Sequence, residues 1–187
     1  MTKRALLVVD IQNDYFTAGR WPLSGMEAAA ANAGRVIAAA HEAGDLVVFI
    51  AHVAAEPDAP FFAPGTEGAE LHAALDVRPG DARVVKHEVN AFKGTDLKQI
   101  LDEAGIEAVT VIGAMSHMCI DAAARAASDF GYAVTVVADA CATRDLDFAG
   151  AMVPAAAAHA AFMSALGFAY ATVVSTADYV AGAAKAA

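Results

Sequence analysis

The chain of 187 residues has little cysteine, little positive charge and no long apolar run. Its two cysteines, Cys119 and Cys141, are too few to crosslink a domain of this size, so we expect free thiols in a reducing, cytoplasmic compartment. There are 12 basic and 22 acidic residues, and the formal net charge is -10. This balance argues against nucleic acid or an anionic membrane surface as a partner, because both attract basic patches.

No segment resembles a transmembrane helix, which needs an apolar run of about 18 residues or more. The most apolar stretch, 149–166, is interrupted by Pro154, His159 and Ser164, as is typical of a buried helix in a globular protein. Asp10 lies at a position where the apolar region of a signal peptide would continue, so a signal peptide is not expected. With 58% hydrophobic and 18% charged residues, the chain is predicted to fold as a single domain over residues 1–187.

Short β-branched runs alternate with alanine-rich helical stretches from end to end. This order predicts an α/β fold with three α/β/α layers, in which helices cover both faces of a parallel sheet. We expect strands at 5–9, 46–51, 82–86, 108–112, 133–138 and 171–174, all apolar and therefore buried on both faces. We expect helices at 27–43, 96–104, 117–130 and from Pro154 onward.

The segment 52–80 does not follow this alternation and is rich in proline and glycine. Loops of this length in compact domains are usually functional or disordered. The aromatic pair Phe61 and Phe62 favours an ordered, packed loop.

Reactive side chains stand at the ends of the first four predicted strands. Asp10 ends the first strand, His52 follows the second, Lys86 ends the third, and Cys119 starts the helix after the fourth. Ligands of open α/β sheets bind beyond the carboxyl ends of the strands, so these side chains are expected to converge there. The structural alternatives are a turn-forming role for Asp10 and a solvated flank for Lys86. Because Lys86 follows the apolar pair Val84-Val85, its ammonium is expected to point into the rim of the cleft.

Cys119 is the candidate nucleophile. The turn 113–118 places its sulfur on the first helical turn, where the helix dipole, free N–H groups and nearby Lys86 are expected to lower the thiol pKa. The same N–H groups could hold an oxyanion. Cys141 is expected to pack as a small hydrophobic residue, and His117 to cap the helix.

These residues form a coherent catalytic set without a Cys-His pair. Cys119 would attack an amide-like carbon, and Lys86 would stabilise and orient its thiolate. Asp10 would pass the proton to the leaving amine and then accept one from the water that releases the acyl group.

Four segments resemble the isochorismatase-like cysteine hydrolases over essentially the whole chain. They are ALLVVDIQNDYF, VVKHEVNAF followed by GTDL, GAMSHMCIDAAARAASDFGY, and VVADACATRD. The resemblance implies an Asp-Lys-Cys triad at Asp10, Lys86 and Cys119 and a six-stranded parallel sheet in the order 3-2-1-4-5-6. It also implies a cis peptide bond between Ala114 and Met115, an oxyanion hole made by the amides of Met115 and Cys119, and a homodimer or homotetramer.

Departures from named branches bear on the substrate. Nicotinamidases carry an Asp-x-His metal motif after the second strand, whereas this chain reads Ile50-Ala51-His52 and lacks the carboxylate. His52 and His72 alone make a poor zinc site, so we expect no metal and no cofactor, and nicotinamidase activity is disfavoured. True isochorismatases cleave a vinyl ether and lack the nucleophilic cysteine, so Cys119 argues against that branch.

Other branches of the family agree better with these features of the sequence. N-carbamoylsarcosine amidase, ureidoacrylate amidohydrolase and streptothricin hydrolase remain as branches, and the HMC and ACATRDL stretches most resemble the streptothricin-like or uncharacterised hydrolases.

The substrate pocket is expected to use residues beside the carboxyl edge of the sheet, with a neighbouring subunit possible at its border. The candidates, for which ordinary loop packing is the alternative, are Phe16, Trp21, His52, Phe61, Asn90 and Phe92.

The leading hypothesis is a metal-independent hydrolase that cleaves the C–N bond of a small amide, ureido or lactam substrate through an acyl-enzyme on Cys119. Nicotinamidase or isochorismatase activity remains an alternative. So do a non-catalytic relative whose alanine-rich helices pack between subunits and a redox sensor based on an exposed Cys119 thiolate.

Overall fold

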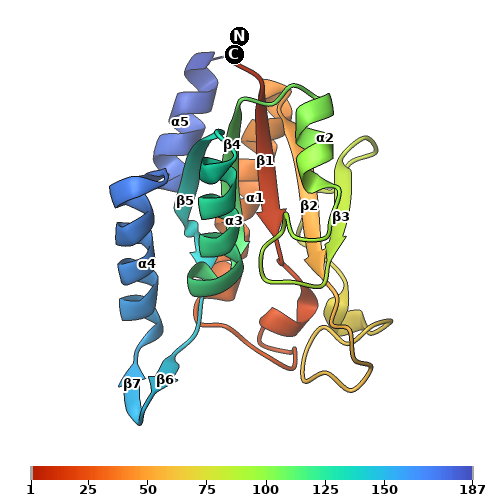
Figure 1. Ribbon diagram of the computed structural model, residues 1–187, viewed down its shortest axis with the longest axis vertical. Helices are drawn as coiled ribbons and strands as arrows, with labels where there is room; N and C mark the ends of the chain where they lie inside the picture. The colour runs from red at the N-terminus through yellow and green to blue at the C-terminus, as the bar shows by residue number, and fades with distance from the viewer. Residues whose placement is uncertain (1, 187) are drawn as a thin grey trace.

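A computed structural model describes residues 2–186 and contains a six-stranded sheet in the order β3-β2-β1-β4-β5-β8, in which every neighbouring pair is parallel (Figure 1). The predicted strand order is confirmed, and the sixth predicted strand is β8 because two short strands precede it. The sheet strands are β1 Arg4–Val9, β2 Leu46–His52, β3 Ala82–Lys86, β4 Ala108–Ala114, β5 Ala133–Ala142 and β8 Thr172–Val174.

Helices cover both faces of the sheet, as the alternation predicts (Figure 1). Residues of α1 Met26–Ala43 and α5 Thr176–Ala186 pack with one core cluster. Residues of α2 Leu97–Glu103, α3 Asp121–Asp129 and α4 Ala155–Ala169 pack with the other.

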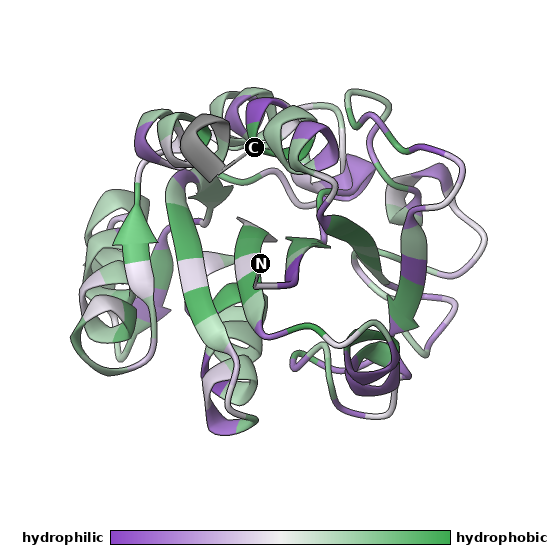
Figure 2. Ribbon diagram, turned by 90° about the horizontal axis from the view of Figure 1, so that it is seen from above, coloured by the Kyte–Doolittle hydropathy of each residue, from purple (hydrophilic) through white to green (hydrophobic). Residues whose placement is uncertain are grey.

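Side chains along β1 point alternately to the two faces of the sheet, and this alternation assigns them to the two cores. Leu6 and Val8 belong to the core on the α1 side, whereas Leu7 and Val9 belong to the core on the α3 side. Figure 2 shows the resulting layers, with largely hydrophobic strands between the helices. Strands at the centre of the sheet are therefore buried on both faces, as predicted.

The expectation that all six strands are buried on both faces is wrong for β8, where Thr172 is exposed and Val173 and Val174 are only partly buried, and for the other edge strand, β3. This strand lies at the edge of the sheet, and Arg83 and Val85 on its outer side are exposed. Val84 and Lys86 alternate with them and are buried. At this edge of the sheet, one face of β3 is exposed to solvent. Side chains alternate between the two faces along a strand, so the Lys86 side chain points inward.

Several local features extend beyond the sequence predictions. β5 continues to Ala142, and a hairpin of β6 Leu146–Phe148 and β7 Ala151–Val153 projects beyond α4 (Figure 1). α5 was not expected either. The predicted helix 117–130 begins instead as a π-helical turn, Ser116–Ile120, before α3.

The loop between β2 and β3 is ordered, as the aromatic pair predicts. Phe62 is fully buried, and its backbone N–H donates to Asp14 Oδ2 at 2.6 Å. Buried Gln12 donates to the carbonyl oxygens of His52 and Ala69 and accepts from the His52 N–H at 2.8 Å. These bonds fix the start of the loop beside the end of β1.

Among residues 2–186, no helix combines the length and the apolar character needed to cross a membrane.

Candidate active site

Three of the predicted side chains meet at the carboxyl edge of the sheet. The Lys86 Nζ atom lies 2.9 Å from Asp10 Oδ2 and 3.3 Å from Cys119 Sγ. The side chains of Asp10 and Lys86 are completely buried, and Cys119 is 5% exposed. The expected convergence of residues from three separate segments is therefore present in the structure.

The local backbone explains this convergence. Asp10 is the first residue after β1 and has a φ of 53°, a left-handed conformation that aspartate tolerates better than most residues. Val9 pairs with Gly113 of β4, where φ is 122° and an added Cβ would overlap the Val9 carbonyl oxygen. Glycine at 113 thus lets the chain that leads to Cys119 pass close to the end of β1.

The Lys86 ammonium is buried among several polar neighbours and does not lie at the rim of a cleft. Besides Asp10 and Cys119, its Nζ lies 3.0 Å from His52 Nδ1 and 3.1 Å from the Glu88 carbonyl oxygen. Burial alone lowers the pKa of this ammonium, but Asp10 and Cys119 outweigh burial and raise it above its ordinary value. Lys86 is therefore a fixed positive charge between carboxylate and sulfur, and the expectation of a rim position is wrong.

The expectation of a lowered thiol pKa at Cys119 is also wrong. Burial, followed by the Asp10 carboxylate, raises the pKa of this thiol, and Lys86 offsets only part of the increase. A thiolate would place a second buried negative charge beside Asp10 with only one ammonium to balance both. In the resting site, Cys119 is accordingly a neutral thiol next to a carboxylate that can accept its proton.

Asp10 is suited to that proton transfer. Its Oδ1 is buried and has no hydrogen-bond partner among the described residues. A carboxylate oxygen without a hydrogen-bond partner can accept a proton from the thiol or from a water molecule.

The turn that carries Cys119 is tightly bonded. The peptide bond between Ala114 and Met115 is cis, as the resemblance implies. The N–H groups of Met118 and Ile120 both donate to the Met115 carbonyl oxygen, at 2.9 and 3.2 Å. Met115 and Cys119 lie on this one turn, and the oxyanion hole that their amides would form stays a prediction.

His117 does not cap a helix, so that expectation is wrong. Its Nδ1 lies 2.6 Å from Thr143 Oγ1, which connects the turn to the end of β5. Buried Ser116 makes a second connection through its Oγ, which lies 3.2 Å from the Ala142 carbonyl oxygen and 2.8 Å from His159 Nδ1 of α4.

The two histidines considered for zinc have other contacts. Burial and then the Lys86 charge lower the pKa of His52, so its neutral Nδ1 accepts from the Lys86 ammonium. His72 stacks on Phe16, with ring centroids 3.6 Å apart, and its Nδ1 accepts from the Ala74 N–H. Within residues 2–186, no three His, Cys, Asp or Glu side chains are grouped as a metal site would require.

Some predicted pocket residues form one aromatic series. Trp21 stacks on Phe61 at 4.9 Å between ring centroids, and Phe61 contacts Phe62 edge-on at 5.1 Å. Phe62 in turn lies 6.0 Å from the ring of His52, the neighbour of Lys86. Ring contacts therefore connect Trp21 and Phe61 to His52, and the His52–Lys86 hydrogen bond connects His52 to the triad.

The other pocket candidates make separate contacts. Phe16 stacks on His72, and Phe92 packs edge-on against Phe130 at 5.2 Å. Asn90 uses its Oδ1 to accept from the Phe92 N–H at 3.0 Å, which is a local turn. Phe16, Asn90 and Phe92 are therefore not part of the aromatic series, and their place in a substrate pocket stays a prediction.

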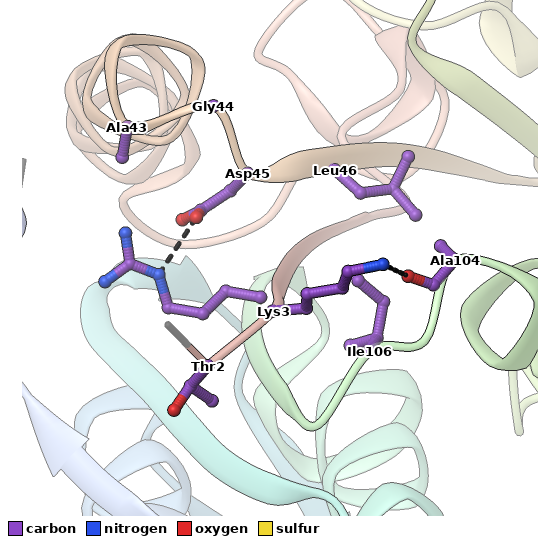
Figure 3. Close-up of a pocket in the computed structure, with 9 residues that line it drawn as sticks. Thr2, Lys3, Ala43, Gly44, Asp45, Leu46, Ala104 and Ile106 are labelled. Atoms are coloured by element: carbon purple, nitrogen blue, oxygen red, sulfur yellow. Dashed lines mark hydrogen bonds and ion pairs between the residues drawn. The ribbon is translucent and has the colours of Figure 1, made fainter.

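A cavity of about 540 Å³ lies at the opposite edge of the sheet from the triad (Figure 3). It opens beside the start of β1 and the end of α1, where Lys3 donates to the Ala104 carbonyl oxygen and Arg4 pairs with Asp45. Both basic side chains there already have partners, so this cavity has no evident part in the chemistry at Cys119.

Sequence reasoning missed two residues near the triad. Tyr15 is buried, and its pKa is raised by burial and by Asp10 and Cys119 but lowered by Arg144. The Arg144 guanidinium lies 4.5 Å from the centre of the Trp21 ring. The available signal was the position of Arg144 just after β5, at the same edge as the other reactive residues.

Comparisons with known proteins agree with this fold. Residues 4–178 match the isochorismatase domain family. A crystal structure of a protein from Oleispira antarctica, assigned to the isochorismatase hydrolases, superimposes with a TM-score of 0.94 at 49% identity and covers 97% of both chains.

Curated relatives belong to the same group. YddQ, an uncharacterised isochorismatase family protein of Bacillus subtilis, is 45% identical over 92% of this chain and 96% of its own length. A streptothricin hydrolase of Streptomyces noursei is 38% identical over 88% of this chain and 59% of its own. More distant relatives include a ureidoacrylate amidohydrolase and a maleamate amidohydrolase.

Proposed function

The chain belongs to the isochorismatase family of hydrolases, and from that premise we propose that it is a cysteine amidohydrolase that cleaves the C–N bond of a small amide, ureido or lactam substrate. One observation carries the proposal. A buried ammonium, Lys86 Nζ, lies 2.9 Å from the Asp10 carboxylate and 3.3 Å from the Cys119 sulfur. Relatives that are named streptothricin hydrolase and amidohydrolase support the reaction class.

Acylation starts from the neutral thiol. Asp10 accepts the Cys119 proton as the sulfur forms a bond to the substrate carbonyl carbon, and the carbonyl π electrons move onto oxygen. Lys86 stays charged and balances the negative charge that passes from the carboxylate to the sulfur. The amides of Met115 and Cys119 would stabilise the oxyanion. When the C–N bond breaks, Asp10 returns the proton to the leaving nitrogen.

Deacylation repeats these steps with water. Asp10 accepts a proton from a water molecule whose oxygen attacks the thioester carbon. The C–S bond breaks, the acid leaves, and the sulfur regains the proton from Asp10. His52 takes no proton in this scheme, because it is neutral and its Nδ1 accepts from Lys86.

A substrate screen tests the proposal. We expect the purified protein to hydrolyse at least one member of a panel of primary amides, ureido compounds and lactams, nicotinamide included. We expect the rate to be unchanged by a chelator, because the Nδ1 of His52 is occupied by Lys86. Loss of activity on chelation would overturn the metal-independent mechanism, and turnover of isochorismate with an inert amide panel would favour the alternative activity.

We also propose that the expected homodimer or homotetramer forms through α4. None of its residues carries a formal charge, and Phe168 on it is 92% exposed. Phe148 and Met152 of the adjacent hairpin are 79% and 65% exposed. An apolar helix surface of this kind is normally covered. A second copy fits because two chains with a net charge of -10 repel each other least at an uncharged surface.

Sedimentation velocity tests the assembly. Phe168→Asp is expected to dissociate the oligomer, because it places a charge in the apolar contact. Val85→Asp changes a 56% exposed residue on the edge strand β3 and is the matched control, expected to leave the oligomer intact. A monomeric wild-type chain, or dissociation by the control alone, would contradict this assembly.

A cytoplasmic location also remains a prediction, which cell fractionation can check.

A further inference from the structure

The turn that carries Cys119, residues 116–120, is π-helical and distinct from the regular helix α3 that follows it. Such turns are rare and occur frequently at functional sites. This one begins directly after Met115 and contains Cys119, so a movement of the turn would displace the sulfur and the Met115 amide together. Contacts that hold the turn in place therefore bear on the reaction.

Ser116 joins this turn to two other elements of the fold. Its side chain is fully buried, and its Oγ lies 3.2 Å from the Ala142 carbonyl oxygen at the end of β5 and 2.8 Å from His159 Nδ1 of α4. A hydroxyl has one proton to donate, and a carbonyl oxygen can only accept. With the Ser116 proton given to Ala142, the proton of the second bond comes from His159. His159 therefore donates from Nδ1 to Ser116 Oγ.

The same side of α4 makes a second contact with the turn. Phe162 is three residues after His159, so the two side chains are neighbours on the helix surface. The Phe162 ring meets the His117 ring edge-on, with centroids 6.1 Å apart, and His117 is bonded to Thr143. Positions 116 and 117 are thus both held between α4 and the end of β5.

A serine beside a histidine is also the arrangement of a nucleophile and its general base. Here Ser116 is fully buried, and its proton is engaged by the Ala142 carbonyl oxygen. Because Nδ1 of His159 donates, the ring presents no lone pair to the hydroxyl and cannot act as its base. The bond between Ser116 and His159 therefore holds the turn and does not activate the serine.

From these contacts we infer that His159 is a positioning residue, which through Ser116 holds the turn so that the Cys119 sulfur and the Met115 amide meet one substrate carbonyl. The inference rests on the proposed function and adds a residue to it. His159 acts on the geometry of attack and touches no reacting atom. A displacement of about 1 Å in a reacting group can reduce a rate on the order of 10²-fold.

An activated ester, p-nitrophenyl acetate, tests this role without an amide substrate. In its reaction the Cys119 sulfur bonds to the acetyl carbon, the C–O bond breaks, nitrophenolate leaves with the electron pair, and the thiol proton passes to Asp10. Stopped-flow absorbance at several ester concentrations separates the acylation rate constant from the half-saturating concentration. The release measured with the Cys119→Ala protein is subtracted.

Three variants test the bond between His159 and Ser116. His159→Leu removes the donor and is expected to lower the acylation rate constant about ten- to a hundredfold with little change in the half-saturating concentration. His159→Asn is expected to restore most of the rate, because its amide nitrogen can donate to Ser116. Adding Ser116→Ala to His159→Leu is expected to cause no further loss, since both changes remove the same bond. Loss of packing alone would not be rescued by asparagine.

His41→Leu is the matched control. His41 is a largely buried histidine of α1 that is bonded through Nε2 to Asp81 Oδ1 at 3.0 Å, and this variant is expected to retain the acylation rate. Circular dichroism confirms that each variant is folded. NMR of the histidine ring nitrogens gives a readout that needs no reaction. Burial lowers the pKa of His159, so at neutral pH the ring is expected to carry one proton, on Nδ1.

The outcomes separate this inference from the proposed function. A folded His159→Leu protein that is acylated as fast as the wild type, equal losses with leucine and asparagine, or a ring proton on Nε2 would overturn the inference, even if amides are hydrolysed. If acylation depends on His159 as expected but no amide is hydrolysed, the positioning role stands and the proposed amidohydrolase is wrong. A wild-type protein that reacts with neither ester nor amide would contradict both.

Discussion

Cys119→Ala is expected to reduce amide hydrolysis by a factor on the order of 10⁴ to 10⁶, the range seen when the nucleophile of a hydrolase is removed. No other side chain in the described site offers a nucleophile beside both Lys86 and Asp10. The substitution removes one buried sulfur and is expected to cost about 1–2 kcal/mol of stability, so the protein should remain folded. Steady-state kinetics on the best substrate of the screen gives the ratio.

The second cysteine supplies the matched control for this prediction. Cys141 is buried, donates to the Val137 carbonyl oxygen, and burial raises its pKa to about 12. Cys141→Ala is therefore expected to lose similar stability while retaining its rate, since packing is the role of this thiol. Equal losses of activity in the two variants would show that the rate follows packing rather than the nucleophile.

Asp10→Asn is expected to change two rates in opposite directions. Hydrolysis should fall by about 10² to 10⁴, because the site loses its proton acceptor and donor. Alkylation of Cys119 by iodoacetamide at neutral pH should become faster than in the wild-type protein. The physical reason is that Asp10 raises the pKa of the thiol and Lys86 lowers it, so removing the carboxylate leaves the lowering effect of Lys86.

The pH dependence of the alkylation rate follows from the raised pKa of the Cys119 thiol. A raised pKa means that the wild-type thiolate forms only above neutral pH, so the alkylation rate should climb in alkaline solution. In the Asp10→Asn protein, the alkylation rate should begin to increase at a lower pH. In the Lys86→Met protein, the increase in the alkylation rate should begin at a higher pH, because the ammonium that favours the thiolate is absent.

Two checks accompany this prediction. Breaking the buried pair of Asp10 and Lys86 costs about 3–5 kcal/mol, so circular dichroism must confirm that each variant is folded. Asp14→Asn removes another buried carboxylate from the same segment, one that holds the Phe62 N–H, and should not accelerate alkylation. An Asp10→Asn protein that is folded and alkylated no faster than the wild type would contradict the proposed charge balance.

Sequence patterns predicted the layered fold because its strands are continuous apolar runs and its helices are separated by them. The strand order came from the family resemblance. The hairpin that contains Phe148 and Met152 was missed, since its strands have three residues each and no buried face to create a pattern. The open side of β3 was missed because position in a sheet is a property of topology, not of the strand itself.

The site was predicted as a set of residues but not as an electrostatic environment. The positions of Asp10, Lys86 and Cys119 follow from strand ends and motifs. The state of the thiol depends on three-dimensional burial, and burial outweighs the ammonium that sequence reasoning placed beside it.

Mass spectrometry of a rapidly quenched reaction can detect the acyl group on Cys119 itself. With the best substrate of the screen in a single turnover, we expect a transient mass increase equal to the acyl group on the peptide that contains Cys119. The increase should appear with release of the amine and should be absent in Cys119→Ala. Complete turnover with no acyl group on Cys119 at any time, together with undiminished turnover by Cys119→Ala, would contradict the acyl-enzyme mechanism.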